Sequence, residues 1–263
     1  MKRRSVKNPQ KDILDTATRM GELLLESGAE IARVEESMER VCRYYGAEGW
    51  SFYVLSNGIF LTAEDAAGNC YARAEHIPLN TTRMDRIEAL NELSREIEQG
   101  RYSPDQAETV LEQIAGLPAK KELYQMLASA CGAAAFCFLP GKGITDTCTA
   151  FLSGFLLQLF LSRAGSHLSK TTGIIGGSVL VSVLCCVSFL SSFGMDLNFM
   201  IIGSIMPLIP GVGFVVSIRD IVNGDYLSGF IRLLDALLVF FCIALGVALT
   251  LSAFELLTGG TLL

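Results

Sequence analysis

The sequence has few residues of the kinds that hold metal ions. Its 263 residues include only two histidines, His76 and His167, which stand far apart in the chain. Its eight cysteines form no C-x-x-C pair, and none lies at zinc-ligand spacing from a histidine. Six of the cysteines lie in apolar segments, where cysteine acts as a small hydrophobic residue. We therefore expect reduced cysteines and no metal site.

Enzyme motifs and a secretion signal are also absent. The chain contains no glycine-rich phosphate loop, no G-x-S-x-G and no H-E-x-x-H. Residues 1–4 are basic, but residues 5–15 are polar where a secretion signal would be apolar. We predict a protein that is not an enzyme, uses no cofactor and keeps its amino terminus in the cytosol.

Charge is scarce in the second half of the chain. Of its 21 basic and 27 acidic residues, only 11 follow Glu122. The first 122 residues hold 16 basic and 21 acidic residues, so they offer no broad basic face, and we expect no nucleic-acid partner. We predict a soluble cytosolic domain over residues 1–122 and a transmembrane domain over residues 123–263.

The first 122 residues have the pattern of a small α+β domain. Apolar residues recur at helical spacing from Ile13 to Leu24 and from Ile31 to Tyr45. Aromatic and β-branched residues around Ser56-Asn57-Gly58, followed by a turn at 65–69, predict two or three short strands. Helices then resume, and Ser103–Gln106 combines a capping box with proline at the first helical position.

Two acidic residues flank the apolar stripe of the second predicted helix. Glu30 and Glu35 are five residues apart, about 140° around a helix, so they do not face each other as a carboxylate pair. We interpret both as solvated residues at the edge of the helix.

Five apolar segments can be placed after residue 122. A hydrocarbon core of about 30 Å takes roughly 20 helical residues to cross. The predicted spans are residues 123–139, 144–161, 172–193, 197–216 and 230–254. Lysine and arginine are concentrated in the connections on the amino-terminal side of the membrane, which places the carboxyl terminus outside. The sequence thus predicts an α-helical polytopic membrane domain with five transmembrane helices.

The fourth predicted span is interrupted near its middle by two prolines and two glycines. These residues are Pro207, Pro210, Gly211 and Gly213. Broken backbone at membrane depth is tolerated only where it is buried in protein or lines a wet cavity. A half-helix beginning near Gly211 would direct its free N–H groups at a substrate carboxylate. A proline kink that only shapes the helix bundle is the alternative.

Charged residues follow this interruption. Arg219, Asp220 and Asp225 lie in the connection, and Arg232 and Asp235 lie at the start of the fifth predicted span. Charges so close to hydrocarbon are costly unless paired, so Arg232 and Asp235, three apart on one helical face, are candidates for an ion pair or a gate. Snorkelling of Arg232 to the interface is the alternative. We expect these five residues to form the cytosolic entrance of a substrate path.

Two blocks of the sequence resemble the threonine/serine exporter (ThrE) family. The first block is residues 21–38, with Gly28, Glu30 and Glu35 as its motif residues. The second block is residues 207–236 and contains the interruption and the charges that follow it. The blocks lie nearly 180 residues apart in the order found in the family, and the resemblance covers essentially the whole chain.

This resemblance implies an exporter of small carboxylate-bearing metabolites. Family members export amino acids such as threonine and serine or, in the YjjP-like branch, dicarboxylates such as succinate. With five predicted spans, the chain resembles the YjjP-like larger subunit, and a short YjjB-like membrane protein would supply the second half. An odd number of spans would allow the second half to enter with inverted orientation, as in many secondary transporters. We expect a subunit of an oligomeric secondary exporter in the bacterial inner membrane.

Two other functions stay open at this point. The cytosolic domain could be a sensor that controls a partner's pore, so that this chain conducts nothing itself. An intramembrane aspartyl protease would need two carboxylates in contact. Asp146 and Asp235 are predicted at opposite faces of the membrane, which argues against a protease.

Overall fold

The protein divides into two compact units, each of which we describe by itself. The computed structural model describes residues 9–64, 70–78, 82–140, 143–164 and 168–259. The first unit contains Met1–Pro118 and Gly211–Leu234, and the second contains Ala119–Pro210 and Asp235–Leu263. Each unit is therefore built from two separate stretches of chain.

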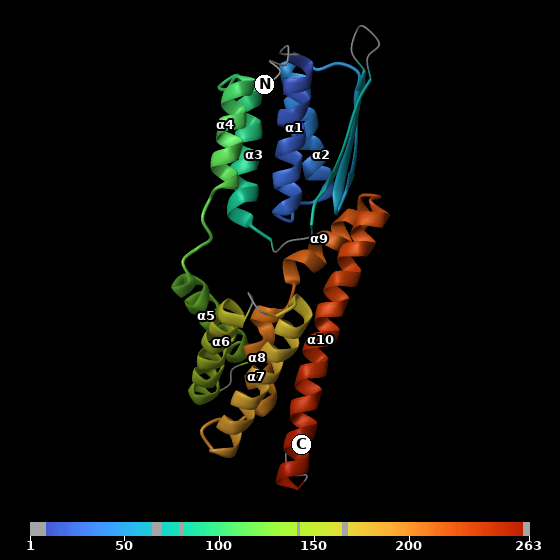
Figure 1. Ribbon diagram of the computed structural model, residues 1–263. Helices are drawn as coiled ribbons and strands as arrows, with labels where there is room; N and C mark the ends of the chain where they lie inside the picture. Colours follow the sequence, from blue (N-terminus) through green and yellow to red (C-terminus); the bar gives the residue numbers. More distant parts are fainter. Residues whose placement is uncertain (1–8, 65–69, 79–81, 141–142, 165–167, 260–263) are drawn as a thin grey trace, which may run out of the picture. The chain divides into compact units, whose positions relative to one another are not determined.

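The first unit begins with two helices and an antiparallel sheet, drawn in blue to cyan in Figure 1. The elements are α1 (Pro9–Glu26), α2 (Ile31–Tyr45), β1 (Trp50–Leu55), β2 (Gly58–Glu64) and β3 (Cys70–His76). The strand order is β1-β2-β3, and Leu55 pairs with Gly58 across the two-residue connection Ser56-Asn57. The predicted strands are confirmed, while the predicted turn at 65–69 lies outside the described residues.

Two further helices, α3 (Met84–Glu98) and α4 (Pro104–Ala115), complete the amino-terminal part of this unit. Helix α4 begins at the predicted capping box. Ser103 N–H donates to Gln106 Oε1 at 2.9 Å, and the reciprocal side-chain bond is also present. The local sequence thus determines where α4 starts.

The core of the first unit lies between the helices and one face of the sheet (Figure 1). Ile59 and Leu61 of β2 are buried in it, whereas Tyr53 and Phe60 are 59% and 48% exposed. The helices contribute the largest buried side chains, among them Leu14, Met20, Leu24, Ile31, Met38, Leu90, Ile97 and Leu111. Each such side chain stabilises the fold by about 1.5–3 kcal/mol on burial.

Helix α9 (Gly211–Val222) and the start of α10 (Tyr226–Thr258) also belong to the first unit. The two helices approach closely at Gly229, where a Cβ atom would lie 2.8 Å from the carbonyl oxygen of Ser217 and 2.9 Å from the nitrogen of Ile221. The connection between them turns at Gly224, whose φ is +100°. Gly224 and Gly229 therefore help to set the direction of α10 relative to α9.

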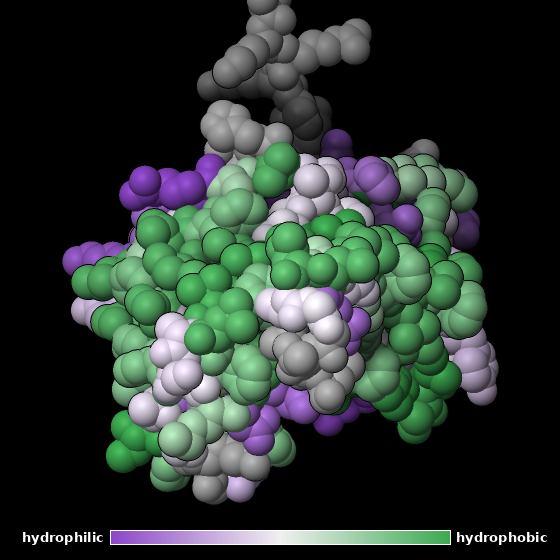
Figure 2. Space-filling model, turned by 90° about the horizontal axis from the view of Figure 1, so that it is seen from below, coloured by the Kyte–Doolittle hydropathy of each residue, from purple (hydrophilic) through white to green (hydrophobic). Residues whose placement is uncertain are grey.

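The second unit is a helical bundle with an apolar surface. It contains α5 (Glu122–Phe138), α6 (Ile144–Ala164), α7 (Lys170–Leu190), α8 (Leu197–Ile205), the short helix η1 (Met206–Leu208) and the remainder of α10. Figure 2, viewed from below, shows a face that is mostly hydrophobic. Large exposed apolar side chains of this unit include Phe136, Leu152, Val187, Leu238 and Phe241. Such a surface is suited to lipid rather than water.

Three or four candidate membrane spans are present in the described chain. Helices α6, α7 and α10 each qualify, and α8–η1 with α9 qualifies as one bent pair. The five predicted spans are thus supported only in part. The first, 123–139, forms α5, whose 17 residues give a helix about 25 Å long, short of a hydrocarbon core of about 30 Å.

Small residues allow the helices of the second unit to approach one another. A Cβ atom on Gly154 of α6 would lie 2.7 Å from Ala133 Cβ and 2.8 Å from the carbonyl oxygen of Ser129, both on α5. Ser129 Oγ also donates to the carbonyl of Gly154 at 2.8 Å. Close backbone approach of this kind is the usual basis of helix association in membranes.

Candidate functional site

A buried carboxylate of α9 contacts the amino-terminal end of α2. Ile31 N–H donates to Asp220 Oδ1 at 3.1 Å, and Asp220 is fully buried. Arg232 of α10 lies on the other side of this carboxylate, with its Nη1 3.3 Å from Asp220 Oδ2. A helix amino terminus and a guanidinium both stabilise negative charge, so this position is built for a carboxylate.

The turn between α1 and α2 presents that amide group. Gly28 has a φ of +79°, and the amides of Gly28 and Ala29 donate to the carbonyls of Leu25 and Leu24 at the end of α1. A Cβ atom on Gly28 would lie 3.0 Å from Thr82 Oγ1. Gly28 is thus required for the tight turn that exposes the first amides of α2, which accounts for its place in the sequence motif.

Glu30 joins the same group of residues. Arg219 Nη1 donates to Glu30 Oε1, and Arg33 lies 3.9 Å from the same oxygen. The Glu30 side chain is only 17% exposed. Its interpretation as a solvated residue is therefore wrong, because a residue 189 positions away in the sequence supplies its partner.

One face of α10 continues this contact. Ser228 and Arg232 are four residues apart in α10, so their side chains lie on one side of the helix, and Asp225 directly precedes the helix. Ser56 N–H, in the connection between β1 and β2, donates to Ser228 Oγ at 3.1 Å. Ser56 and Ser228 were not predicted as site residues, although Ser228 lies inside the second family-like block.

Glu35 lies one helical turn after Ile31 on α2. Burial raises the pKa of the Glu35 carboxyl, and the nearby carboxylates of Asp225 and Glu39 raise it further. A hydrogen bond from the Val54 backbone acts in the opposite direction but is the smallest of these effects. Glu35 is thus a half-buried acid near Asp225 and not a solvated residue.

The raised pKa of Glu35 predicts a pH-dependent stability. Because the folded protein holds the proton more tightly than the unfolded chain, the stabilising effect is complete below the unfolded pKa and disappears as pH rises through the folded pKa. Glu35→Gln should therefore raise the melting temperature at pH 7.5 but leave it unchanged near pH 4. Thermal unfolding of the purified full chain measures this, with Glu98→Gln, an exposed glutamate of α3, as the control. Equal melting-temperature differences at both pH values would contradict the assignment.

The predicted interruption of the fourth span is present. The short helix η1 ends at Leu208, Ile209 is extended with φ −69° and ψ 124°, and α9 begins at Gly211 directly after Pro210. A Cβ atom on Gly211 or Gly213 would meet nothing within 4 Å. A new helix therefore begins at Gly211, and the first backbone amides of this helix have no partner within it. The space around Gly211 and Gly213 is open.

Arg232 and Asp235 do not form the predicted pair. Arg232 pairs with Asp220 of α9, whereas Asp235 accepts a hydrogen bond from Lys170 Nζ of α7 at 2.7 Å. The Lys170 and Asp235 side chains are 59% and 43% exposed. The two charges of α10 thus belong to different contacts, because each has a closer partner on another helix.

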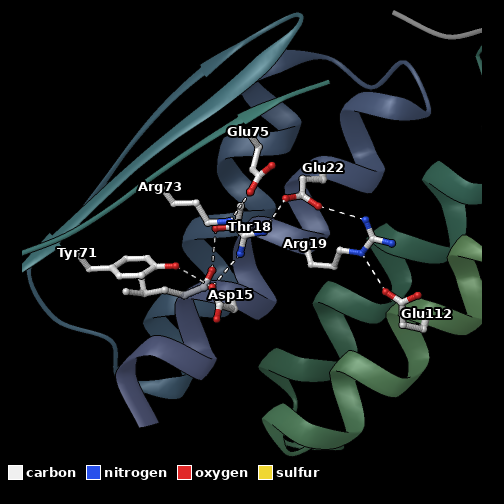
Figure 3. A network of polar contacts seen from close by, with 9 residues as sticks. Asp15, Thr18, Arg19, Glu22, Tyr71, Arg73, Glu75 and Glu112 are labelled. Atoms are coloured by element: carbon white, nitrogen blue, oxygen red, sulfur yellow. Dashed lines mark hydrogen bonds and ion pairs between the residues drawn. The ribbon is translucent and has the colours of Figure 1, made fainter. Parts of the chain in front are cut away.

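A second polar network lies in the first unit, away from the predicted residues (Figure 3). The Arg73 guanidinium of β3 contacts Asp15, Glu22 and Glu75 at 2.7 to 3.3 Å. Burial alone would lower the pKa of Arg73, but these carboxylates outweigh it and raise the pKa. Arg19 links Glu22 of α1 to α4. We interpret this network as a structural link between sheet and helices.

Metal-ligating residues do not cluster in the part of the chain that the structure describes. No group of three or more histidine, cysteine, aspartate or glutamate residues within residues 9–64, 70–78, 82–140, 143–164 and 168–259 is placed to hold an ion. All eight cysteines are free thiols. Of the two histidines, His167 lies outside the described residues.

Comparisons with known proteins identify the family. A family model described as "Putative threonine/serine exporter" (ThrE) matches residues 15–254. The "Probable threonine/serine exporter" of Mycobacterium tuberculosis (strain ATCC 25618 / H37Rv) is 25% identical over 249 residues, which cover 91% of this chain and 46% of the relative. The "Threonine/serine exporter" of Corynebacterium glutamicum is 24% identical over 259 residues, or 93% of this chain and 52% of the relative.

The chain thus spans about half the length of the curated relatives that it matches. No solved structure gives a significant match. Because the family model covers nearly all of the described chain, including both sequence blocks that form the site, the protein belongs to the ThrE family of threonine/serine exporters.

Proposed function

We propose that this protein is a subunit of a secondary exporter that moves threonine- or serine-type amino acids out of the cell. Membership of the ThrE family supports the transport class and the substrate type. Succinate-type dicarboxylates are the second substrate class that we test. The chain lacks a nucleotide-binding motif, and an ion gradient or the substrate's own gradient would drive export.

The observation that carries this proposal is the junction between the two sequence blocks within the first unit. The start of α2 meets α9 there through the Glu30–Arg219 and Ile31–Asp220 hydrogen bonds, and Arg232 of α10 pairs with Asp220. We propose that Arg219, Asp220, Asp225, Arg232 and Asp235 line the cytosolic entrance. Substrate contact would open or close it.

The interrupted helix would be the second part of the substrate path. Pro207 and Pro210 separate α8 from α9, and the open space at Gly211 and Gly213 leaves the first amides of α9 approachable. A half-helix that begins inside the membrane is a favourable place for a substrate carboxylate. We propose that these four residues shape that place.

A partner and an orientation complete the proposal. A short YjjB-like membrane subunit would supply the second half of the transporter in an oligomer within the bacterial inner membrane. The amino terminus would lie in the cytosol and the carboxyl terminus outside, in keeping with the distribution of lysine and arginine.

Efflux from preloaded cells tests the proposal. Cells are loaded with labelled threonine, serine or succinate and express the chain alone or with a YjjB-like protein encoded beside its gene. We expect threonine and serine to leave only when both proteins are present. Export by this chain alone would remove the partner from the proposal, and no export by both, with both in the membrane, would contradict the function.

A glycine variant separates a conducting subunit from a sensor. Gly213→Ala adds a methyl group where the structure has open space, as does the control Gly132→Ala in α5. We expect both variants to assemble with the partner, but only Gly213→Ala to reduce efflux, by about tenfold if a substrate contact is lost. Normal efflux from Gly213→Ala would favour a subunit that controls a partner's pore.

A further inference from the structure

Helix α9 has the reverse polarity of a water-soluble helix. Its polar residues Ser217 and Asp220 are fully buried, whereas Val215, Ile218 and Val222 are 59%, 44% and 79% exposed. A helix at the surface of a soluble domain turns its apolar stripe toward the core and its polar side toward water. The exposed side of α9 therefore does not have the composition of a surface that faces water.

The start of α10 repeats this reversal within the first unit. Ser228 and Arg232 are buried, whereas Leu227, Phe230 and Leu234 are 55%, 56% and 50% exposed. These three apolar residues are three and four positions apart, so they lie on one side of the helix. We refer to the exposed set Val215, Ile218, Val222, Leu227, Phe230 and Leu234 as the α9–α10 apolar residues.

Helix α4 of the same unit has the ordinary polarity. Its buried residues are Ala107, Leu111 and Ile114, and its exposed residues include Glu108 and Glu112. The reversal is thus confined to part of the unit and is not a general property of it. The surroundings of α9 and the start of α10 must differ from those of α4.

The rest of α10 indicates what these surroundings are. Beyond Leu234, the same side of the helix continues with the exposed residues Leu238, Phe241 and Leu245. The whole helix is a candidate membrane span of 33 residues, about 50 Å long, which exceeds both a hydrocarbon core of about 30 Å and a whole bilayer of about 40–45 Å. The apolar side that faces acyl chains in the span therefore continues without a break into the first unit.

The charges of this region are placed as lipid surroundings require. Charged residues near hydrocarbon face the protein interior and pair with one another. Arg232 Nη1 lies 3.3 Å from Asp220 Oδ2 on the buried side of the two helices. Arg219, which is exposed, has a long side chain that reaches Glu30, as expected of a residue that snorkels toward the membrane surface.

We propose that α9 and the start of α10 are inserted into the interfacial layer of the bilayer, with the α9–α10 apolar residues against acyl chains. An amphipathic helix in this position buries its apolar side about 5–10 Å into the boundary between headgroups and chains. Residues 217–229, which lie between two predicted spans, then contact lipid as well as water. The first unit is bound to the membrane surface through this surface, whichever substrate the protein exports.

Tryptophan fluorescence in vesicles tests the proposal. The single native tryptophan is removed by Trp50→Phe, and one tryptophan is introduced into the full chain by Val222→Trp or Phe230→Trp. Phosphatidylcholine with brominated acyl chains quenches tryptophan that touches the chains. We expect a loss of fluorescence in both variants as large as that of Phe241→Trp, later in α10. The control Tyr53→Trp, on the exposed side of the sheet, should lose none.

Iodide in the aqueous phase identifies the alternatives. Quenching of Val222→Trp and Phe230→Trp by iodide but not by brominated lipid would show that the surface faces water. Protection from both quenchers would show that a second copy of the chain covers it. Either result would overturn the proposal.

A measurement on the wild-type chain does not depend on the folding of any variant. A phospholipid that carries a photoreactive carbene precursor at the end of an acyl chain is activated in the vesicles, and labelled peptides are identified by mass spectrometry. We expect label within Gly211–Leu234 as well as in the remainder of α10, and none in α4. Label in the remainder of α10 without label in Gly211–Leu234 would contradict the insertion of the first unit.

Discussion

Replacing Asp220 with alanine is expected to destabilise the first unit by about 3–5 kcal/mol, because it leaves the Arg232 guanidinium buried without its counter-ion. Asp220 is fully buried and Arg232 is 8% exposed, so water cannot replace the lost partner. The variant also removes the acceptor of the Ile31 amide at the start of α2. Few other single substitutions in this unit should have so large an effect.

Fluorescence of the single tryptophan measures this loss. Trp50 begins β1, so it reports on the unfolding of the first unit. Asp220→Ala combined with Arg232→Met should recover most of the stability, since an apolar pair avoids the cost of two buried charges. Arg101→Gln, which breaks an exposed ion pair with Glu96, should cost less than about 1 kcal/mol. An Asp220→Ala cost as small as this control would show that the buried pair is not needed for stability.

Asp235→Asn is expected to slow threonine efflux about tenfold or more, since an ionisable residue at the membrane boundary is a strong functional candidate. Its pair with Lys170 is well exposed, with 59% and 43% of the two side chains accessible. Such a pair contributes only about 0–1 kcal/mol to stability. A loss of transport could therefore not be ascribed to unfolding.

A charge exchange provides the control for this prediction. Lys170→Asp alone should impair efflux, and Lys170→Asp combined with Asp235→Lys should restore part of it if the ion pair itself controls opening. Membrane levels of all three variants are compared with wild type by immunoblotting. Wild-type efflux rates in Asp235→Asn would remove this residue from the mechanism.

The features that could be predicted from the sequence all depend on neighbouring residues. The connection at Ser56-Asn57, the capping box at Ser103 and the break between Pro207 and Gly211 each follow from residue types within a few positions. The break was expected because proline and glycine interrupt a helix whatever surrounds them. The number of spans was less certain, since α5 is too short to decide by length.

The site itself depends on contacts that no local pattern reports. Asp220 meets Ile31 across 189 positions, and Arg219 meets Glu30 across the same interval. Helical spacing suggested that Arg232 pairs with Asp235, but the close approach of α9 and α10 at Gly229 brings Asp220 nearer. Sequence spacing can show which residues share a helix face, but not which element packs against that face.

The two-part construction of the first unit also has a consequence for biosynthesis. Its second part, Gly211–Leu234, is translated after the hydrophobic helices α5 to α8. While the candidate spans α6 and α7 enter the bilayer, the amino-terminal part still lacks the carboxylate that accepts from the Ile31 amide and the partner of Glu30. Completion of this unit on the ribosome is therefore coupled to membrane insertion, and a chain that stalls before α9 would expose an unfinished surface to chaperones and proteases.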